Sequence, residues 1–291
     1  MGIELDIRPL NPVIGAEVHG VDLREELDDE TVAAIRRVLL DHQVIFFRDQ
    51  DLDRDRHISF GRRFGDLHIH PAAELPDQYP ELLRIHADEN SKGVAGEGWH
   101  SDVSCDPEPP MGSILKLNTV PPSGGDTLFA SAHAAFDTLS EAMQDFLSGL
   151  SAIHSGQHVY SRQGYREDRT FPESEHPVVR THPETMRQAL FVDSGFTTRI
   201  RQLRRAESDA LLAYLFAHIA NPQHQCRFRW EPNSIAFWDN RAVQHLAVWD
   251  YYPEVRAGWR VTIGGDKPYY DPDGTKGSSP GRLRPAPSWR R

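Results

Sequence analysis

The stretch Trp-His-Ser-Asp at residues 99–102 places an imidazole and a carboxylate two positions apart. In an extended segment the side chains of His100 and Asp102 leave the same face, because side chains alternate along a strand. A second stretch, Trp-Asp-Asn-Arg-Ala-Val-Gln-His at residues 238–245, supplies His245. Two imidazoles and one carboxylate occupy one face of an octahedral ion, an arrangement typical of non-haem Fe(II) oxygenases. We therefore expect His100, Asp102 and His245 to bind a metal.

The His-x-Asp pattern alone is a weak signal. The chain has 15 histidines and repeats the pattern at His86 and Asp88. Taken by itself, the pattern is more often a surface loop or a structural histidine than a metal site. The assignment therefore depends on the sequence around it.

Composition restricts the class of protein. Hydrophobic residues make up 38% of the 291 positions and charged residues 26%, as in an ordinary globular protein. A net charge of −11 argues against nucleic acid as a partner. The two cysteines, Cys105 and Cys226, form no CxxC motif, which argues against a thiolate zinc site. No signal peptide or membrane-length apolar run is evident, so we expect a cytoplasmic protein with no membrane partner.

Short strands dominate the predicted secondary structure. The apolar spacing i, i+3, i+7 predicts helices at about 28–42, 53–64 and 140–150, and another from Ser208. Residues 66–98 are rich in turns, and we expect them to form a lid over the site. Residues 155–176 are polar and irregular. Strands are expected at 3–7, 14–23, 44–47, 113–117, 128–129, 178–180, 188–192, 225–230, 234–238, 242–247 and 258–264.

Many short strands with glycine and proline turns predict a mainly β fold. We expect a double-stranded β-helix (jelly roll) core with flanking α-helices. This architecture brings Asp102 beside His245 although they are 245 − 102 = 143 residues apart. We expect one domain over residues 1–270, followed by a disordered tail over residues 271–291.

Seven segments of the chain together follow one pattern of order and spacing. They are Ile14–Leu23, Trp99–Asp102, Ser123–Thr127, His176–Pro183, Phe196–Ile200, Phe237–His245 and Arg256–Pro268. This pattern resembles the taurine dioxygenase / 2,4-dichlorophenoxyacetate dioxygenase family over about residues 5–270. The resemblance implies an oxygenase that uses Fe(II), 2-oxoglutarate and O2 on a jelly-roll scaffold.

The resemblance also assigns roles to individual residues. It gives His100, Asp102 and His245 to iron, and it leaves the pair at 86–88 outside the motif. Arg256 matches the arginine that binds the far carboxylate of 2-oxoglutarate, and Thr127 matches a residue whose hydroxyl supports it. The positions implied to contact the substrate are His70, Val103, Tyr160, Phe196 and Arg260.

Residue types alone are less decisive for these roles. Arg256 and Arg260 are four apart, so on a strand both point the same way, toward one pocket. By base rate they could equally be two surface arginines. Tyr160 and Phe196 could be ordinary core residues. Cys105 is expected to be a small hydrophobe lining the pocket rather than a nucleophile.

The substrate pocket departs from the family's taurine pattern. His70 and Arg260 remain, but Ala73 stands where the family has a tyrosine and Gly96 where it has an asparagine. Cys105 replaces an aromatic residue. These changes remove two polar contacts and enlarge the pocket, which argues against taurine itself while keeping an anionic substrate.

The leading hypothesis is therefore hydroxylation of a C–H bond in a small organic anion, such as a taurine-like sulfonate, with release of succinate and CO2. Within this class, alkyl sulfates, aryloxyalkanoates and biosynthetic carboxylates remain alternatives. A hypothesis from another class is a non-catalytic jelly roll that binds a metal or an anion. The resemblance also implies a homo-oligomer.

Overall fold

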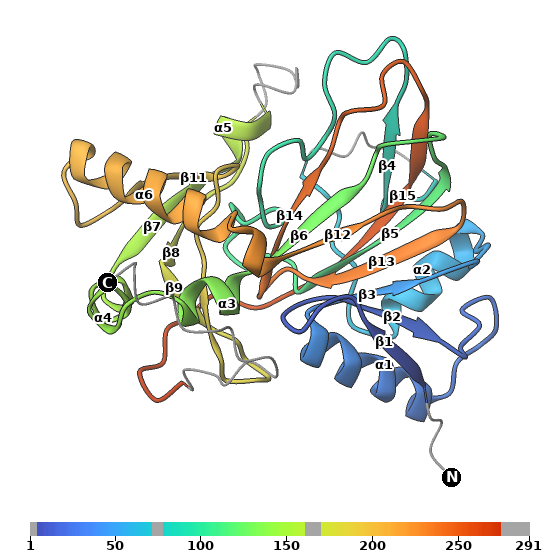
Figure 1. Ribbon diagram of the computed structural model, residues 1–291, viewed down its shortest axis with the longest axis horizontal. Coiled ribbons are helices and arrows are strands. Elements are labelled where there is room, and N and C mark those ends of the chain that lie inside the picture. The colour runs from blue at the N-terminus through green and yellow to red at the C-terminus, as the bar shows by residue number, and fades with distance from the viewer. Residues whose placement is uncertain (1–4, 72–77, 161–169, 275–291) are drawn as a thin grey trace.

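Two sheets lie close together in the centre of the computed structural model, which describes residues 5–71, 78–160 and 170–274 (Figure 1). The larger sheet has seven strands in the order β1 (Asp6–Pro9), β2 (Ala16–His19), β3 (Val44–Phe47), β13 (Ser234–Asp239), β5 (Gly112–Thr119), β15 (Arg256–Ile263) and β4 (Leu82–Ala87). The smaller has three, in the order β12 (Gln225–Phe228), β6 (Thr127–Ser131) and β14 (Val243–Ala247).

Alternating side chains on the central strands divide the apolar residues between two cores. Phe46 on β3 and Trp238 on β13 pack between the two sheets, where Phe46 stacks on Phe228 of β12 at a centroid distance of 4.0 Å. Phe47 and Phe237, their neighbours in sequence, point to the opposite face of the larger sheet. Each sheet thus buries one face against the other, as the predicted jelly roll requires.

Two helices cover the outer face of the larger sheet (Figure 1). Helix α1 (Asp29–His42) begins where Asp28 caps the backbone N–H of Thr31 at 2.7 Å, and it buries Ile35 and Leu39. Helix α2 (Arg54–Arg62) begins after the N-cap Asp53. Both helices confirm the elements expected from apolar spacing.

A second group of elements surrounds another apolar core beside the sheets. It includes the predicted hairpin over residues 178–192, whose strands pair Ala189 with Arg180. Its members are α3 (Ala132–Asp137), α4 (Glu141–Ser148), β7 (Ser151–Ser155), α5 (Gly156–Tyr160), β8 (Glu173–Pro177), β9 (Val179–Thr181), β10 (Gln188–Leu190), β11 (Thr197–Ile200), α6 (Arg205–Ile219) and η1 (Pro222–His224).

Three expectations about these elements were wrong. The turn-rich stretch 66–98 contains β4, which pairs with β15 at the edge of the larger sheet. The polar stretch 155–176 contains α5 and β8. Helix α6 begins at Arg205 rather than at Ser208, because Glu207 caps the N–H of Arg204 at 2.9 Å, while the Ser208 hydroxyl accepts the N–H of Ile200 at 2.8 Å.

The start of the predicted tail lies against the second core. The N–H of Asp271 donates to Thr181 Oγ1 at 2.9 Å, and Gly274 is buried. Residues 275–291, the rest of the expected tail, lie outside the described residues. In the part of the chain that is described, every helix is too short or too polar to cross a bilayer.

We predict that His57 makes the protein sensitive to acid. Its side chain on α2 is buried, its Nε2 lies 3.0 Å from the Ile114 carbonyl, and burial lowers its pKa from 6.5 to about 4. Below pH 6.5 the unfolded chain binds a proton that the folded protein excludes, so the free energy of unfolding decreases as the pH falls toward 4. The His57 contribution to that decrease is about 2 kcal/mol between pH 7 and pH 5.

Urea unfolding at pH 7 and pH 5 measures this difference. The free energy of unfolding of the His57→Gln protein should depend less on pH than that of the unchanged protein. The control is His86→Gln, which alters a partly exposed histidine on β4 and should leave this pH dependence unchanged. Identical pH dependence in the unchanged and His57→Gln proteins would contradict the assignment.

Candidate active site

His100, Asp102 and His245 converge at the β14 edge of the smaller sheet. His245 lies on β14, and a two-residue bridge joins it to His100: each residue's N–H donates to the other's carbonyl, at 2.9 and 3.1 Å. The Nε2 atoms of His100 and His245 lie 3.7 and 3.9 Å from Asp102 Oδ1. One ligand atom from each residue falls within 4.8 Å of the others, so a single ion can contact all three.

The local backbone differs from the extended segment expected at residues 100–102. His100 makes only the isolated bridge with β14, and Asp102 begins a turn in which Val103 has a φ of +49°. The chain is therefore paired with β14 at His100 and turns from Asp102 onward. The side chains of His100 and Asp102 lie together, as expected.

The hydrogen bonds of His100 leave one ring nitrogen for a ligand. Its Nδ1 lies 2.8 Å from the Gly98 carbonyl, which can only accept, so Nδ1 carries the proton. Nε2 then presents its lone pair to the cluster, the tautomer that a metal-binding histidine needs. Burial, together with the nearby His100, lowers the pKa of His245 well below its usual value, so this imidazole is neutral as well.

The Asp102 carboxylate is ionised in the buried site. Burial acts to raise its pKa, but the positive charge of Arg260 and the hydrogen bond from Ser113 contribute to holding it below the usual range. Ser113 Oγ donates to Asp102 Oδ2 at 2.7 Å, while Oδ1 faces the two histidines and accepts from Arg260. Two neutral imidazoles and one carboxylate are donors that suit a divalent first-row metal.

A cavity of about 610 Å³ opens over these three residues. Every residue singled out from the sequence as a site residue lines it, from elements far apart in the chain. They are His70, His100, Asp102, Val103, Thr127, Tyr160, Phe196, His245, Arg256 and Arg260.

Arg256 lies in the cavity wall on β15, 4% exposed. Its Nε donates to the Gly125 carbonyl at 3.0 Å and its Nη2 to Thr127 Oγ1 at 3.2 Å. Trp230 Nε1 donates to the same hydroxyl at 2.9 Å, which fixes Thr127 beside the guanidinium. Burial lowers the pKa of Arg256, yet an arginine stays charged in proteins, so the wall carries a buried positive charge whose hydrogen bonds go to neutral oxygens.

Arg260 lies four residues further along β15 and also lines the cavity. One of its nitrogens donates to Asp102 Oδ1, and its Nε, which is buried, has no hydrogen-bond partner among the described residues. Tyr160 Oη lies 3.4 Å from His70 Nε2, and the Tyr160 ring packs edge-on to Phe196 at 6.0 Å. This part of the cavity combines cationic and aromatic groups.

Two residues marked as departures from the family pattern can be placed. Gly96 has a φ of +84°, and a Cβ at this position would lie 2.9 Å from His100 Cε1. A glycine is thus what lets the backbone pass over the ring of His100. Cys105 is buried in the apolar cluster with Val103, Tyr160 and Phe171, behind the cavity wall, so the expected pocket-lining position was wrong. Ala73 lies outside the described residues.

The lid expected at residues 66–98 is only partly a loop. The loop residues 92–98 line the cavity, whereas Leu83 and Ile85 line it from β4. The sequence analysis did not identify Leu83 and Ile85 as cavity residues, because it did not predict strand β4. His86 and Asp88, the second His-x-Asp pair, lie near the surface, where His86 Nε2 is 3.2 Å from Asp88 Oδ2.

The chain is similar to known proteins over most of its length. A profile of the family described as "Taurine catabolism dioxygenase TauD, TfdA family" matches residues 6–262. An alpha-ketoglutarate-dependent sulfate ester dioxygenase of Pseudomonas putida is 37% identical over 91% of this chain and 91% of its own length.

Two solved structures resemble the chain in three dimensions. A putative alpha-ketoglutarate-dependent taurine dioxygenase from Burkholderia xenovorans superposes with a TM-score of 0.82 and 38% identity, covering 94% of this chain and 96% of that one. AAD-2, solved in complex with Mn(II) and N-oxalylglycine, gives a TM-score of 0.83 and 26% identity, covering 91% of this chain and 99% of that one. The chain therefore belongs to the TauD/TfdA family, and it is a 2-oxoglutarate-dependent dioxygenase with a jelly-roll fold.

Proposed function

We propose that the protein binds Fe(II) at His100, Asp102 and His245 and hydroxylates a C–H bond of a small organic sulfonate or sulfate ester. 2-Oxoglutarate is consumed in the same reaction, with release of succinate and CO2. The observation that carries the proposal is that one cavity contains both the three metal-binding side chains and the buried Arg256–Thr127 pair.

The donor set fits the metal. Two neutral imidazoles and an ionised carboxylate come from one side of the cavity and leave its open side to ligands. Bound iron would supply the activation of O2 and a place for the keto acid of 2-oxoglutarate to chelate. The structure of AAD-2 holds a divalent metal together with N-oxalylglycine, which supports this reading of the shared fold.

Arg256 and Thr127 would bind the far carboxylate of 2-oxoglutarate. A guanidinium has five N–H donors in a planar fork, and the two hydrogen bonds of Arg256 leave donors for a carboxylate in the cavity. The charge is buried, so its attraction for an anion is stronger than at the surface. A protein that only carried a metal would have no need of this pair.

Arg260 and His70 would bind the anionic group of the substrate. Both line the same cavity, together with the apolar side chains Leu83, Ile85 and Val159. These walls exclude water from the reacting C–H bond and suit an apolar body better than the amino group of taurine. The sulfate ester dioxygenase of Pseudomonas putida supports a substrate of this class.

Oxygen uptake in the presence of Fe(II), ascorbate and 2-oxoglutarate tests the proposal. The panel contains taurine, longer alkyl sulfonates, alkyl sulfates and aryloxyacetates, and succinate is measured in parallel. We expect the alkyl sulfonates or sulfates to stimulate uptake most, with succinate formed in equal amount. Stimulation by aryloxyacetates alone would reject the sulfur oxyanion and keep the oxygenase. No uptake by protein that has bound Fe(II) would favour a non-catalytic carrier.

A further inference from the structure

Asn240 is a buried residue beside the site whose side chain joins several groups around Asp102. It is 2% exposed and follows directly after β13. Its Oδ1 accepts the backbone N–H of Asp102 at 3.2 Å and the indole N–H of Trp238 at 2.9 Å. Its Nδ2 donates to Ser113 Oγ at 3.1 Å, and Ser113 in turn donates to Asp102 Oδ2 at 2.7 Å.

These contacts form a closed ring that fixes the direction of every proton. Two N–H donors meet Asn240 Oδ1, so the amide oxygen must lie on that side and the amide nitrogen must face Ser113. Because the Ser113 oxygen accepts from that nitrogen, its own proton goes to Asp102 Oδ2. Oδ2 is thereby engaged by Ser113, and Oδ1, which also accepts from Arg260, is the oxygen that faces His100 and His245.

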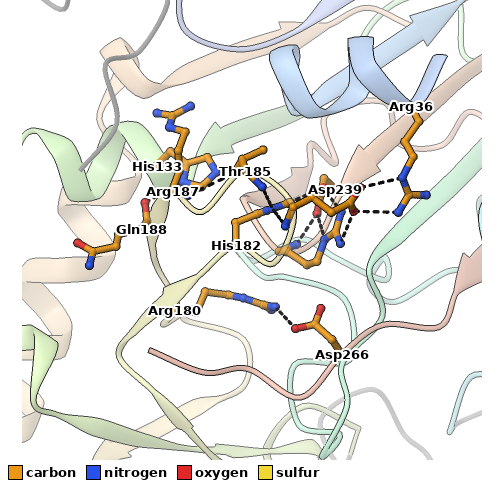
Figure 2. A network of polar contacts seen from close by, with 11 residues as sticks. Arg36, His133, Arg180, His182, Thr185, Arg187, Gln188, Asp239 and Asp266 are labelled. Carbon is orange, nitrogen blue, oxygen red and sulfur yellow. Dashed lines mark hydrogen bonds and ion pairs between the residues drawn. The ribbon is translucent and has the colours of Figure 1, made fainter. Parts of the chain in front are cut away.

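The backbone that carries Asn240 is itself held by a network of charges around the buried Asp239 (Figure 2). Asp239 accepts from Arg241 through both oxygens, at 2.9 and 2.7 Å, and from His182 Nε2 at 3.0 Å. Although burial acts to raise the pKa of Asp239, the charge of Arg241 is foremost in holding it well below its usual range. Glu184 bridges Arg241 and Arg36 at 2.8 Å each. The turn at residues 239–242 is therefore a rigid support that leads directly into β14 and His245.

The side chain of Asn240 is not needed to make this turn. The Ala242 N–H closes it on the Asp239 carbonyl at 3.1 Å, and the Arg241 N–H donates to Asp239 Oδ1 at 2.9 Å. The φ of Asn240 is not positive, so asparagine has no conformational advantage there. All of the side-chain hydrogen bonds instead go to Asp102, Ser113 and Trp238.

We propose that Asn240 is a positioning residue that, through Ser113, presents one oxygen of Asp102 to the metal and holds the other away from it. This inference rests on the proposed function, because it assumes that His100, Asp102 and His245 bind a metal. A carboxylate free to rotate would lose the fixed geometry of the site, and removal of groups that orient a metal ligand typically weakens metal binding about 10–100-fold.

Anaerobic titration with Co(II), followed by its visible absorption, tests the inference without any need for turnover. We expect the Co(II) dissociation constant to rise about 10–100-fold in Asn240→Ala and in Ser113→Ala. In the double variant the loss of Co(II) binding free energy should be smaller than the sum of the losses in the two single variants, because both residues belong to one ring of hydrogen bonds. Asn118→Ala, which removes an exposed asparagine on β5, is the matched control and should bind Co(II) as the unchanged protein does.

The outcomes separate this inference from the function on which it rests. A purely structural role would lower the melting temperature of the metal-free variants and leave the dissociation constant of the folded protein unchanged, which would overturn the inference. Should Asn240→Ala fail to fold, Ser113→Ala, a loss of one hydroxyl, gives the same comparison. Failure of the unchanged protein to bind Co(II) would instead overturn the proposed metal centre itself.

Discussion

The Asp102→Asn protein is expected to lose 2-oxoglutarate-dependent oxygen uptake by about 10³-fold. Asparagine has nearly the same shape as aspartate, so the turn and the hydrogen bond from Ser113 can persist. The change removes the one anionic donor of the cluster and leaves Arg260 without its buried carboxylate partner. A loss of about 4 kcal/mol in metal binding and transition-state stabilisation corresponds to this factor, since each 1.36 kcal/mol is tenfold.

The chain contains its own control for this experiment. Asp88 belongs to the second His-x-Asp pair, and it interacts with His86 near the surface, outside the cavity. Asp88→Asn therefore makes the same chemical change in the same local sequence pattern, and it should leave oxygen uptake as it was. Equal losses in the two variants would show that the 100–102 pair has no special role.

The sequence was sufficient to find the three candidate metal ligands, but not the backbone that brings them together. His100, Asp102 and His245 could be picked out because few residue types bind such a metal and because the segments around them resemble a known family. The bridge between His100 and β14 could not, because it joins residues 145 positions apart (245 − 100 = 145). A local sequence pattern does not report a contact of this kind.

The elements that were predicted well are those with a clear apolar pattern. Helix α1 has a capping aspartate and a regular apolar stripe, and its bounds follow from both. Strand β4 was missed because it is a short edge strand that includes Arg84 and His86 and lies within a stretch rich in turn residues. Leu83 and Ile85, which line the cavity from this strand, were missed with it.

Residues that support the site were the hardest to identify from sequence. Asn240 stands inside a motif that was recognised, yet its role depends on Ser113, 127 residues away. Gly96 was interpreted as a lost polar contact with the substrate. In the structure Gly96 lies against the ring of His100, where a side chain has no room. The lack of a Cβ therefore leaves space for this ring as well as for the pocket.

Replacement of Arg256 by lysine is expected to raise the KM for 2-oxoglutarate about 100-fold and to change the KM for the organic substrate much less. Lysine keeps the charge but loses the planar fork, and it cannot make both hydrogen bonds, to the Gly125 carbonyl and to Thr127. Weakening one partner of a buried, hydrogen-bonded ion pair costs about 2–5 kcal/mol. A 100-fold loss of affinity corresponds to about 2.8 kcal/mol, which lies within this range.

Arg227→Lys provides the matched control for this prediction. Arg227 lies on β12, where its guanidinium pairs with Asp126 at 2.6 Å while its side chain is largely exposed, and exposed pairs contribute little. Initial rates of succinate formation, with each substrate varied in turn, separate the two KM values. A rise in the KM for the sulfonate or sulfate alone would move the role of Arg256 to the organic substrate. Because Arg256 and Arg260 share one strand and one cavity, that result would exchange the two roles rather than remove them.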